Sequence, residues 1–187
     1  MFFYASQNPV SIMASALKNL SQYDDSTLPS AEGLKFGIVV SEWNQEITHA
    51  LYEACFDTLV KHGAKPEDIE TIQVPGAFEL PSGAKLLLSN FKLDAVVCIG
   101  CVIKGETKHD EYISNAVATG LMGLGVASGI PCIFGVLTPN TYEQAKERAG
   151  GKHGNKGVEG AVTAIRMAAL KYEVKKPAKS VGFRTGQ

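Results

Sequence analysis

The run AVVCIGCVI (residues 95–103) leads directly into the polar segment KGETKH (residues 104–109). An uncharged run rich in β-branched residues is typical of a strand that is buried on both faces, as in a parallel sheet. Ligands of parallel α/β sheets bind outside the carboxyl ends of the strands. The polar segment offers a glycine there for close backbone approach, and a histidine that titrates near neutrality. We therefore look for chemistry at His109.

The composition is that of one ordinary globular domain. The chain has 187 residues, of which 45% are hydrophobic and 20% are charged, and this is enough for one well-buried core. Its 18 basic and 19 acidic residues are evenly mixed, so no basic face indicates nucleic acid or an anionic membrane as a partner. We expect small-molecule substrates. The first four residues lack the features of a signal peptide, Met13 is an alternative start, and the expected location is the cytoplasm.

All four cysteines lie inside apolar segments, at Cys55, Cys98, Cys101 and Cys132. This placement favours reduced core thiols over a disulfide framework. The C-x-x-C of Cys98 and Cys101 lies within the expected strand, whereas a zinc site needs a second ligand pair and a redox site needs a strand-to-helix turn. We expect these two thiols to pack in the core.

One long stretch, between Glu111 and Glu143, contains no charged residue and raises the question of a membrane span. The segment Gly129-Ile130-Pro131 and three earlier glycines divide it into a helix followed by a buried strand. No membrane span is expected.

The apolar periodicity alternates between strands and helices along the chain. The expected strands are 36–40, 69–74, 95–103 and 132–137, and the expected helices are 47–62, 78–90, 110–128, 138 to about 150, and 158–172. Right-handed crossovers make this an α/β fold, a single-domain three-layer sandwich whose four-stranded parallel flavodoxin-like sheet carries helices on both faces. The domain spans 34–173. Residues 1–33 form an extension that is weakly structured or packs on a neighbour, and 174–187 form a basic tail.

Four strand ends should meet at one edge of this sheet and bring together residues 42–43, 76–79, 104–109 and 138–140. Two aromatic residues, a carboxylate and a histidine at such an edge would suit a flat, hydrogen-bonding ring with a polar substituent. From about Lys35 to Tyr172 the sequence also resembles the lumazine synthase family. The motifs that carry the resemblance are SEWN (41–44), VPGAFELP (74–81), G-x-T-x-H (105–109), FGVLT (134–138) and ERAG (147–150) through KHGNKG (152–157).

The resemblance implies an enzyme of riboflavin biosynthesis. Such an enzyme condenses 5-amino-6-(D-ribitylamino)uracil with 3,4-dihydroxy-2-butanone 4-phosphate to 6,7-dimethyl-8-ribityllumazine, phosphate and water. No metal and no organic cofactor are implied. Schiff-base formation, phosphate elimination and ring closure each move protons, and this demands a group that titrates near the working pH. The resemblance assigns that general acid/base role to His109.

The resemblance also implies which residues bind the two substrates. Those for the ribitylaminouracil are Trp43, Ala77, Phe78, Glu79, Cys101, Val102, Ile103 and Phe134. Those for the butanone phosphate are Glu106, Thr107 and Arg148, with Lys156 as a further candidate. At the position of Trp43 the family commonly has phenylalanine, so the larger indole should strengthen binding of ring compounds, riboflavin among them. Only the backbone N–H of Glu106 should serve the phosphate, because a carboxylate would repel it.

A helix that begins near Thr138 would carry Arg148 roughly 15 Å from the carboxyl edge and away from its own His109. One chain should therefore hold only part of a site. The resemblance implies homopentamers with sites between neighbours, to which the adjacent subunit contributes Phe134, Arg148 and Lys156. Twelve pentamers form an icosahedral shell of sixty subunits in part of the family, and the sequence leaves pentamer or shell open. Riboflavin synthase is the candidate protein partner.

Three other interpretations are less favoured. The segment GGKHGNKG (150–157) lacks the spacing of a nucleotide-binding P-loop and joins two expected helices, so we reject that function. A flavin-binding carrier is favoured only by the layout and Trp43. A shell protein that merely encloses a partner would need no intact His109 and Arg148.

Overall fold

A four-stranded parallel sheet organises the chain. The structure is a computed structural model that describes residues 21–174. The sheet order is β2-β1-β3-β4, with every neighbouring pair parallel. The strands are β1 (Phe36–Ser41), β2 (Ile69–Val74), β3 (Ala95–Cys101) and β4 (Cys132–Leu137). The α/β class predicted from the alternating pattern is confirmed.

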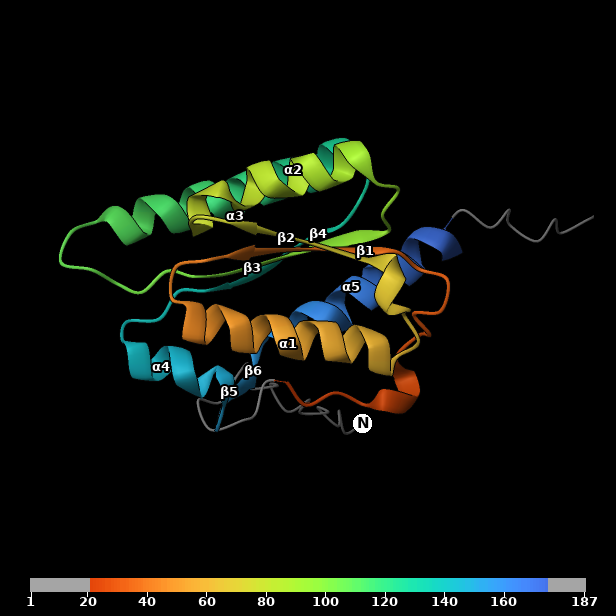
Figure 1. The fold of residues 1–187 in the computed structure, drawn as a ribbon, viewed down its shortest axis with the longest axis horizontal. Helices are drawn as coiled ribbons and strands as arrows, with labels where there is room; N and C mark the ends of the chain where they lie inside the picture. Colours follow the sequence, from red (N-terminus) through yellow and green to blue (C-terminus); the bar gives the residue numbers. More distant parts are fainter. Residues whose placement is uncertain (1–20, 175–187) are drawn as a thin grey trace, which may run out of the picture.

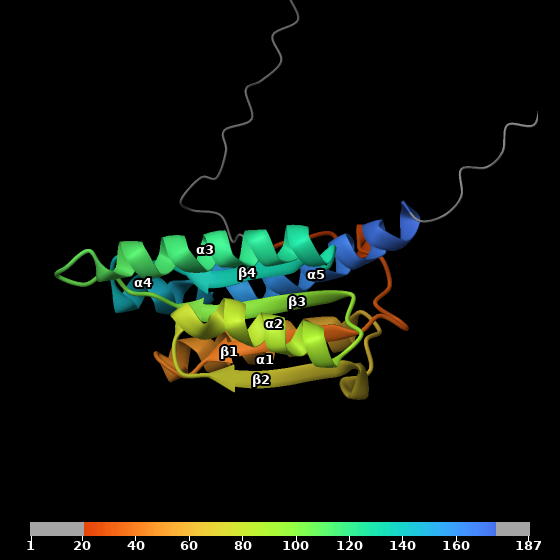
Figure 2. The same ribbon diagram turned by 90° about the horizontal axis from the view of Figure 1, so that it is seen from above.

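Helices cover both faces of the sheet, as Figures 1 and 2 show. On one face lie α1 (Gln45–Lys61), the short α4 (Tyr142–Glu147) and α5 (Lys156–Glu173). On the other lie α2 (Leu80–Asn90) and α3 (His109–Ser128). Successive strand residues point to opposite faces, so β1 sends Ile38 into the core under α1 and α5, and Val39 into the core under α2 and α3. Each such fully buried side chain contributes roughly 1.5–3 kcal/mol.

Most element bounds agree with the periodicity to within two residues. The strand β3 ends at Cys101 instead of residue 103, after which Lys104 N–H donates to the carbonyl of Pro139 (3.0 Å). The helix α2 begins at Leu80, because a single 3₁₀ turn (Ala77–Glu79) precedes it. The helix α3 already includes His109. The histidine therefore lies at the first residue of a helix.

The expected helix from Thr138 to about Gly150 is wrong in length, since α4 spans only Tyr142–Glu147. Thr141 caps its start by accepting from Gln144 N–H (3.2 Å). Gly150 has a φ of 116°, which a helix does not allow, and the chain turns into a small antiparallel pair, β5 (Ala149–Gly151) and β6 (Gly154–Asn155). Arg148 thus follows a helix of about 9 Å, and the estimate of roughly 15 Å along a longer helix does not hold.

The described part of the N-terminal segment lies against its own domain. Ala31 is fully buried, Tyr23 Oη lies 2.9 Å from Nε2 of His62, and Asp25 pairs with Lys61 (2.8 Å). Residues 1–20, with the alternative start Met13, and the basic residues 175–187 lie outside the described part of the chain.

The four cysteines are unpaired, and three of them are fully buried or nearly so. Cys98 faces the core under α2 and α3, whereas Cys101 belongs to the core of the opposite face. The C-x-x-C pair therefore does not face one common ligand, and the expected core packing is confirmed. Burial raises the pKa of the Cys55 thiol to about 12 and that of Cys101 to about 11. Within residues 21–174, no helix is long and apolar enough to cross a membrane.

The crossing of α5 over α1 yields a prediction about stability. A Cβ at Gly157 would lie 1.8 Å from the carbonyl oxygen of Leu51, whereas a Cβ at Gly160 would lie 3.0 Å from a methyl group of Val97. We expect Gly157→Ala to destabilise the protein by more than the ~1–3 kcal/mol typical of overpacking, because backbone cannot yield as a side chain does. Gly160→Ala, the matched control, should cost less. Urea unfolding midpoints check this order, and equal midpoints would contradict it.

Candidate active site

A cavity of about 730 Å³ opens at the carboxyl edge of the sheet. Its wall comes from the ends of β1, β2 and β3 and from the first turns of α3. The lining residues are Trp43, Asn44, Gly76, Ala77, Phe78, Glu79, Cys101, Val102, Ile103, Gly105, Thr107, His109, Asp110 and Ile113. This is the edge at which the sequence predicted a site, and the volume suits a ligand of moderate size.

Two exposed aromatic rings flank the cavity. Trp43 is 69% exposed and Phe78 is 56% exposed, whereas the other large apolar side chains of the lining, Val102, Ile103 and Ile113, are partly buried. The backbone N–H of Trp43 donates to the carbonyl of Pro75 (3.3 Å). The indole ring lies beside Gly76, where an added Cβ would be 3.8 Å from Cε3 of Trp43. Aromatic rings that are exposed in this way can stack on a flat ligand.

The carboxylate of Glu79, the last residue of the 3₁₀ turn directly before α2, is held in place by a backbone donor. Its Oε2 accepts from Gly76 N–H (3.1 Å), which satisfies a backbone donor at the end of β2. An ionised carboxylate accepts through both oxygens. The second oxygen of Glu79 is therefore suited to a ligand hydroxyl.

His109 lies at the end of the loop that follows β3. Its backbone N–H donates to Thr107 Oγ1 (3.4 Å), and both residues line the cavity together with Gly105. Glu106 is exposed and is not part of the lining. Backbone N–H groups ahead of a helix favour anions because the helix dipole is positive there. This loop combines a histidine side chain with backbone N–H groups placed where an anion is favoured.

Besides Glu106, three residues with an expected role do not line this cavity: Phe134, Arg148 and Lys156. Phe134 is partly buried on β4, against the core under α2 and α3. Arg148 follows α4, and Lys156 begins α5. Within one chain, the structure therefore brings most of the expected residues into one cavity and leaves Phe134, Arg148 and Lys156 outside it.

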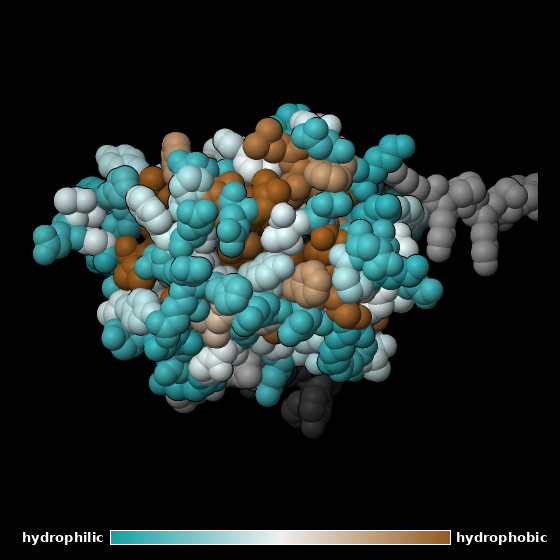
Figure 3. Space-filling model, viewed as in Figure 1, coloured by the Kyte–Doolittle hydropathy of each residue, from teal (hydrophilic) through white to brown (hydrophobic). Residues whose placement is uncertain are grey.

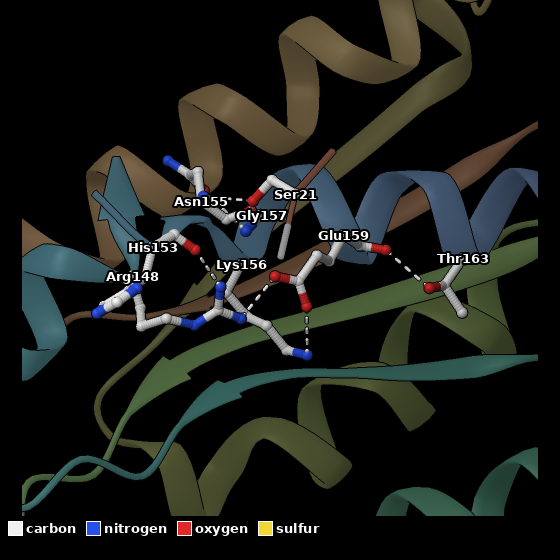
Figure 4. Close-up of polar contacts among 8 residues, drawn as sticks. All are labelled: Ser21, Arg148, His153, Asn155, Lys156, Gly157, Glu159 and Thr163. Atoms are coloured by element: carbon white, nitrogen blue, oxygen red, sulfur yellow. Dashed lines mark hydrogen bonds and ion pairs between the residues drawn. The ribbon is translucent and has the colours of Figure 1, made fainter. Parts of the chain in front are cut away.

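Arg148 and Lys156 share one carboxylate, that of Glu159 in the first turn of α5 (Figure 4). Arg148 Nη2 lies 2.5 Å from Glu159 Oε1, and Lys156 Nζ lies 3.0 Å from Oε2. Arg148 Nη1 also donates to the carbonyl of His153 (2.6 Å). Arg148 and Glu159 are only 19% and 20% exposed, so this cluster is largely fixed and carries one net positive charge.

The sequence reasoning missed four residues of these two groups, namely Asn44, Asp110, Ile113 and Glu159. Asn44 lies inside a motif that was recognised, but no role was given to it. Asp110 and Ile113 are the next inward positions of α3 after His109, at helical spacing. Glu159 carried no signal, because an acidic residue in the first turn of a helix is common for electrostatic reasons.

Comparison with known proteins identifies the family. The family model described as 6,7-dimethyl-8-ribityllumazine synthase matches residues 33–172. The chain is 49% identical to a 6,7-dimethyl-8-ribityllumazine synthase of Christiangramia forsetii over 87% of this chain and 98% of the relative. It is 50% identical to that of Parabacteroides distasonis (83% and 97%) and 51% identical to that of Cytophaga hutchinsonii (84% and 98%). The chain therefore belongs to the 6,7-dimethyl-8-ribityllumazine synthase family.

Proposed function

We propose that this chain condenses 5-amino-6-(D-ribitylamino)uracil with 3,4-dihydroxy-2-butanone 4-phosphate to 6,7-dimethyl-8-ribityllumazine, phosphate and water, and that it does so at the cavity of the carboxyl edge. One observation carries the proposal: a histidine, a carboxylate and two exposed rings line the same cavity in a member of this family. The reaction is the penultimate step of riboflavin biosynthesis.

The cavity suits the ribitylaminouracil. The pyrimidine ring stacks on Trp43, and backbone groups of residues 101–103 pair with its polar edge. The segment Ala77, Phe78 and Glu79 holds the ribityl chain, whose hydroxyls donate to the Glu79 carboxylate. Two of these contacts depend on geometry described above, the exposure of Trp43 and the fixed carboxylate of Glu79.

The loop that ends at His109 suits the second substrate. The N–H groups of Glu106 and Thr107 lie ahead of α3 and bind the phosphate of the butanone. His109 transfers protons as the amine of the uracil attacks the ketone, as phosphate leaves, and as the ring closes. Holding both substrates in one cavity replaces a bimolecular encounter by an oriented one.

The phosphate also needs side-chain cations, and we propose that these come from a neighbouring subunit. Arg148 and Lys156 do not line the cavity of their own chain, yet they form a fixed cationic cluster with Glu159. In a ring of subunits, this cluster and Phe134 complete the next chain's cavity. A homopentamer provides five such sites, and a sixty-subunit icosahedral capsid is the larger form of the same assembly.

Exposed apolar side chains support such an assembly. Leu86 on α2, and Tyr112, Met122 and Val126 on α3, are between 60% and 78% exposed. Figure 3 shows hydrophobic residues gathered over the upper part of the molecule, where α2 lies, while the region of α1 and α4 is mostly hydrophilic. Large exposed apolar patches mark interfaces more often than free surface.

Two further parts of the proposal concern the cell. The four unpaired thiols are typical of a reducing compartment, which supports the cytoplasm. The lumazine product is the substrate of riboflavin synthase, and we propose that enzyme as the protein partner. Trp43 separately favours a second function, flavin binding without turnover, which the assays below distinguish.

Loss of His109 should abolish most of the catalysis. We expect His109→Ala to lower kcat about 10²–10⁴-fold, because general acid/base catalysis contributes that much. Product fluorescence and phosphate release measure it. His49→Ala is the matched control, since His49 is exposed, pairs with Glu53 (3.3 Å) and is not part of the cavity lining. Wild-type protein that forms no lumazine above the uncatalysed background would contradict the function.

Shared sites should allow complementation between two inactive variants. After subunit exchange of His109→Ala with Arg148→Ala at equal amounts, about a quarter of the interfaces would regain both groups. We expect activity to recover to about that share of the wild-type value. A double variant that carries both changes in one chain is the control and should gain nothing alone. Verified exchange without recovery would count against shared sites, and sedimentation distinguishes pentamer from shell.

Trp43 is the single tryptophan of the chain, so its fluorescence reports directly on the cavity. Riboflavin should quench it on binding. We expect Trp43→Phe to weaken riboflavin binding about fivefold, or ~1 kcal/mol, because the smaller ring offers less stacking area. Flavin fluorescence in a titration measures both proteins, and equal affinities would show that the indole adds nothing.

A further inference from the structure

Asn44 has an unusual backbone conformation at the edge of the cavity. Its φ of 59° and ψ of 45° place it in the left-handed region, and it is the one non-glycine residue with a positive φ within residues 21–174. Residues other than glycine seldom adopt this conformation, and asparagine tolerates it better than most. Strained residues persist where the surrounding structure holds them, often at functional sites.

The contacts of Asn44 connect three strand ends. Its side-chain Nδ2 donates to the carbonyl oxygen of Cys101 (2.9 Å), the last residue of β3. Its own carbonyl accepts from Ile47 N–H (2.8 Å) and so begins α1. The two residues before it are held to the end of β2, since Glu42 N–H donates to the carbonyl of Val74 (2.9 Å) and Trp43 to that of Pro75.

This bridge has a direct bearing on the ligand cavity. The Trp43 ring is largely exposed and has no bond of its own to β3, so the backbone on its two sides sets where it lies. On the side toward α1, that backbone is Asn44, and the amide of Asn44 fixes its distance from β3. The hydrogen bond from Asn44 to Cys101 therefore helps to set the separation between the Trp43 ring and the backbone of 101–103, together with the backbone bonds of Glu42 and Trp43 to the end of β2.

Glycine and aspartate each reproduce only one of the two features of Asn44. Glycine adopts the positive φ readily but has no amide. Aspartate keeps the shape, yet an ionised carboxylate accepts only and would face the Cys101 carbonyl oxygen without a proton. These two substitutions separate the side-chain bridge from the backbone turn.

We propose that Asn44 is a positioning residue that holds the Trp43 ring and the end of β3 at the separation that a flat ring ligand requires. It acts through Trp43 and the Cys101 carbonyl. The inference rests on the proposed function for its link to turnover, but its geometric part concerns any ring ligand of the cavity.

The test compares Asn44→Gly and Asn44→Asp with the wild-type protein. We expect both to raise KM for the ribitylaminouracil about tenfold, because losing one net hydrogen bond weakens binding by about that factor. The kcat and the KM for the butanone phosphate should change less than about twofold. Riboflavin affinity, measured by quenching of Trp43, should fall by a similar factor. Asn90→Ala is the matched control, because Asn90 Nδ2 also donates to a backbone carbonyl, that of Leu86 (2.8 Å), at the far end of α2.

Two results would overturn the inference. Either Asn44→Gly binds riboflavin and the ribitylaminouracil as tightly as the wild type, or it lowers kcat and weakens both substrates equally, together with a lowered unfolding midpoint, as general destabilisation would. The flavin titration needs no turnover. If wild-type protein forms no lumazine, the proposed function fails, while an unchanged flavin affinity of Asn44→Gly separately rejects the role of Asn44.

Discussion

Parallel pairing of the strands brings the candidate site together. β1 lies between β2 and β3 in a register that pairs Ser41 with Val74 and Val40 with Ile99. Because the three strands run in the same direction, the segments that follow them leave the sheet side by side. Residues 42–44, 75–79 and 102–108 therefore meet without any long loop. An antiparallel neighbour would send one of these segments to the opposite edge. The buried, uncharged character of β3 thus has a functional consequence, since only helices on both faces stabilise such a strand.

The second constraint is electrostatic. Arg148 and Lys156 lie on the face covered by α1 and α5, where both are mostly withdrawn from water. A cation in such a place is costly unless it is paired. Glu159 supplies that partner, and the carbonyl of His153 satisfies a further N–H of the arginine. The pairing stabilises both cations within one chain. In our proposal, the same cations bind a phosphate held by the neighbouring chain.

Much of the fold could be predicted from the sequence, because the signals were local. Periods of two and 3.6 residues indicated four strands and most helices to within two residues. The length of α4 was predicted wrongly, because the helix begins only after the Thr141 cap and ends at Glu147, just before β5. The roles of the site residues came from family resemblance, because the residue pattern alone indicated only that two aromatic residues, a carboxylate and a histidine meet at one edge of the sheet. Asn44 was missed for a different reason: its contact to Cys101 joins positions far apart in sequence that only the folded chain brings together.

The position of Glu159 and Lys156 at the beginning of α5 has a consequence for motion. The same helix packs on β3 and β4 and crosses α1 so closely that Gly157 nearly touches the backbone of Leu51. Its first turn therefore moves only if the interior of the domain moves with it. The side chains of Lys156 and Glu159, held by their ion pair, therefore lose conformational entropy when the chain folds, before any ligand arrives. A rigid first turn of α5 favours ligand recognition by a preformed surface over closure of a lid. In our proposed assembly, the remaining degree of freedom is then the orientation of one subunit relative to the next.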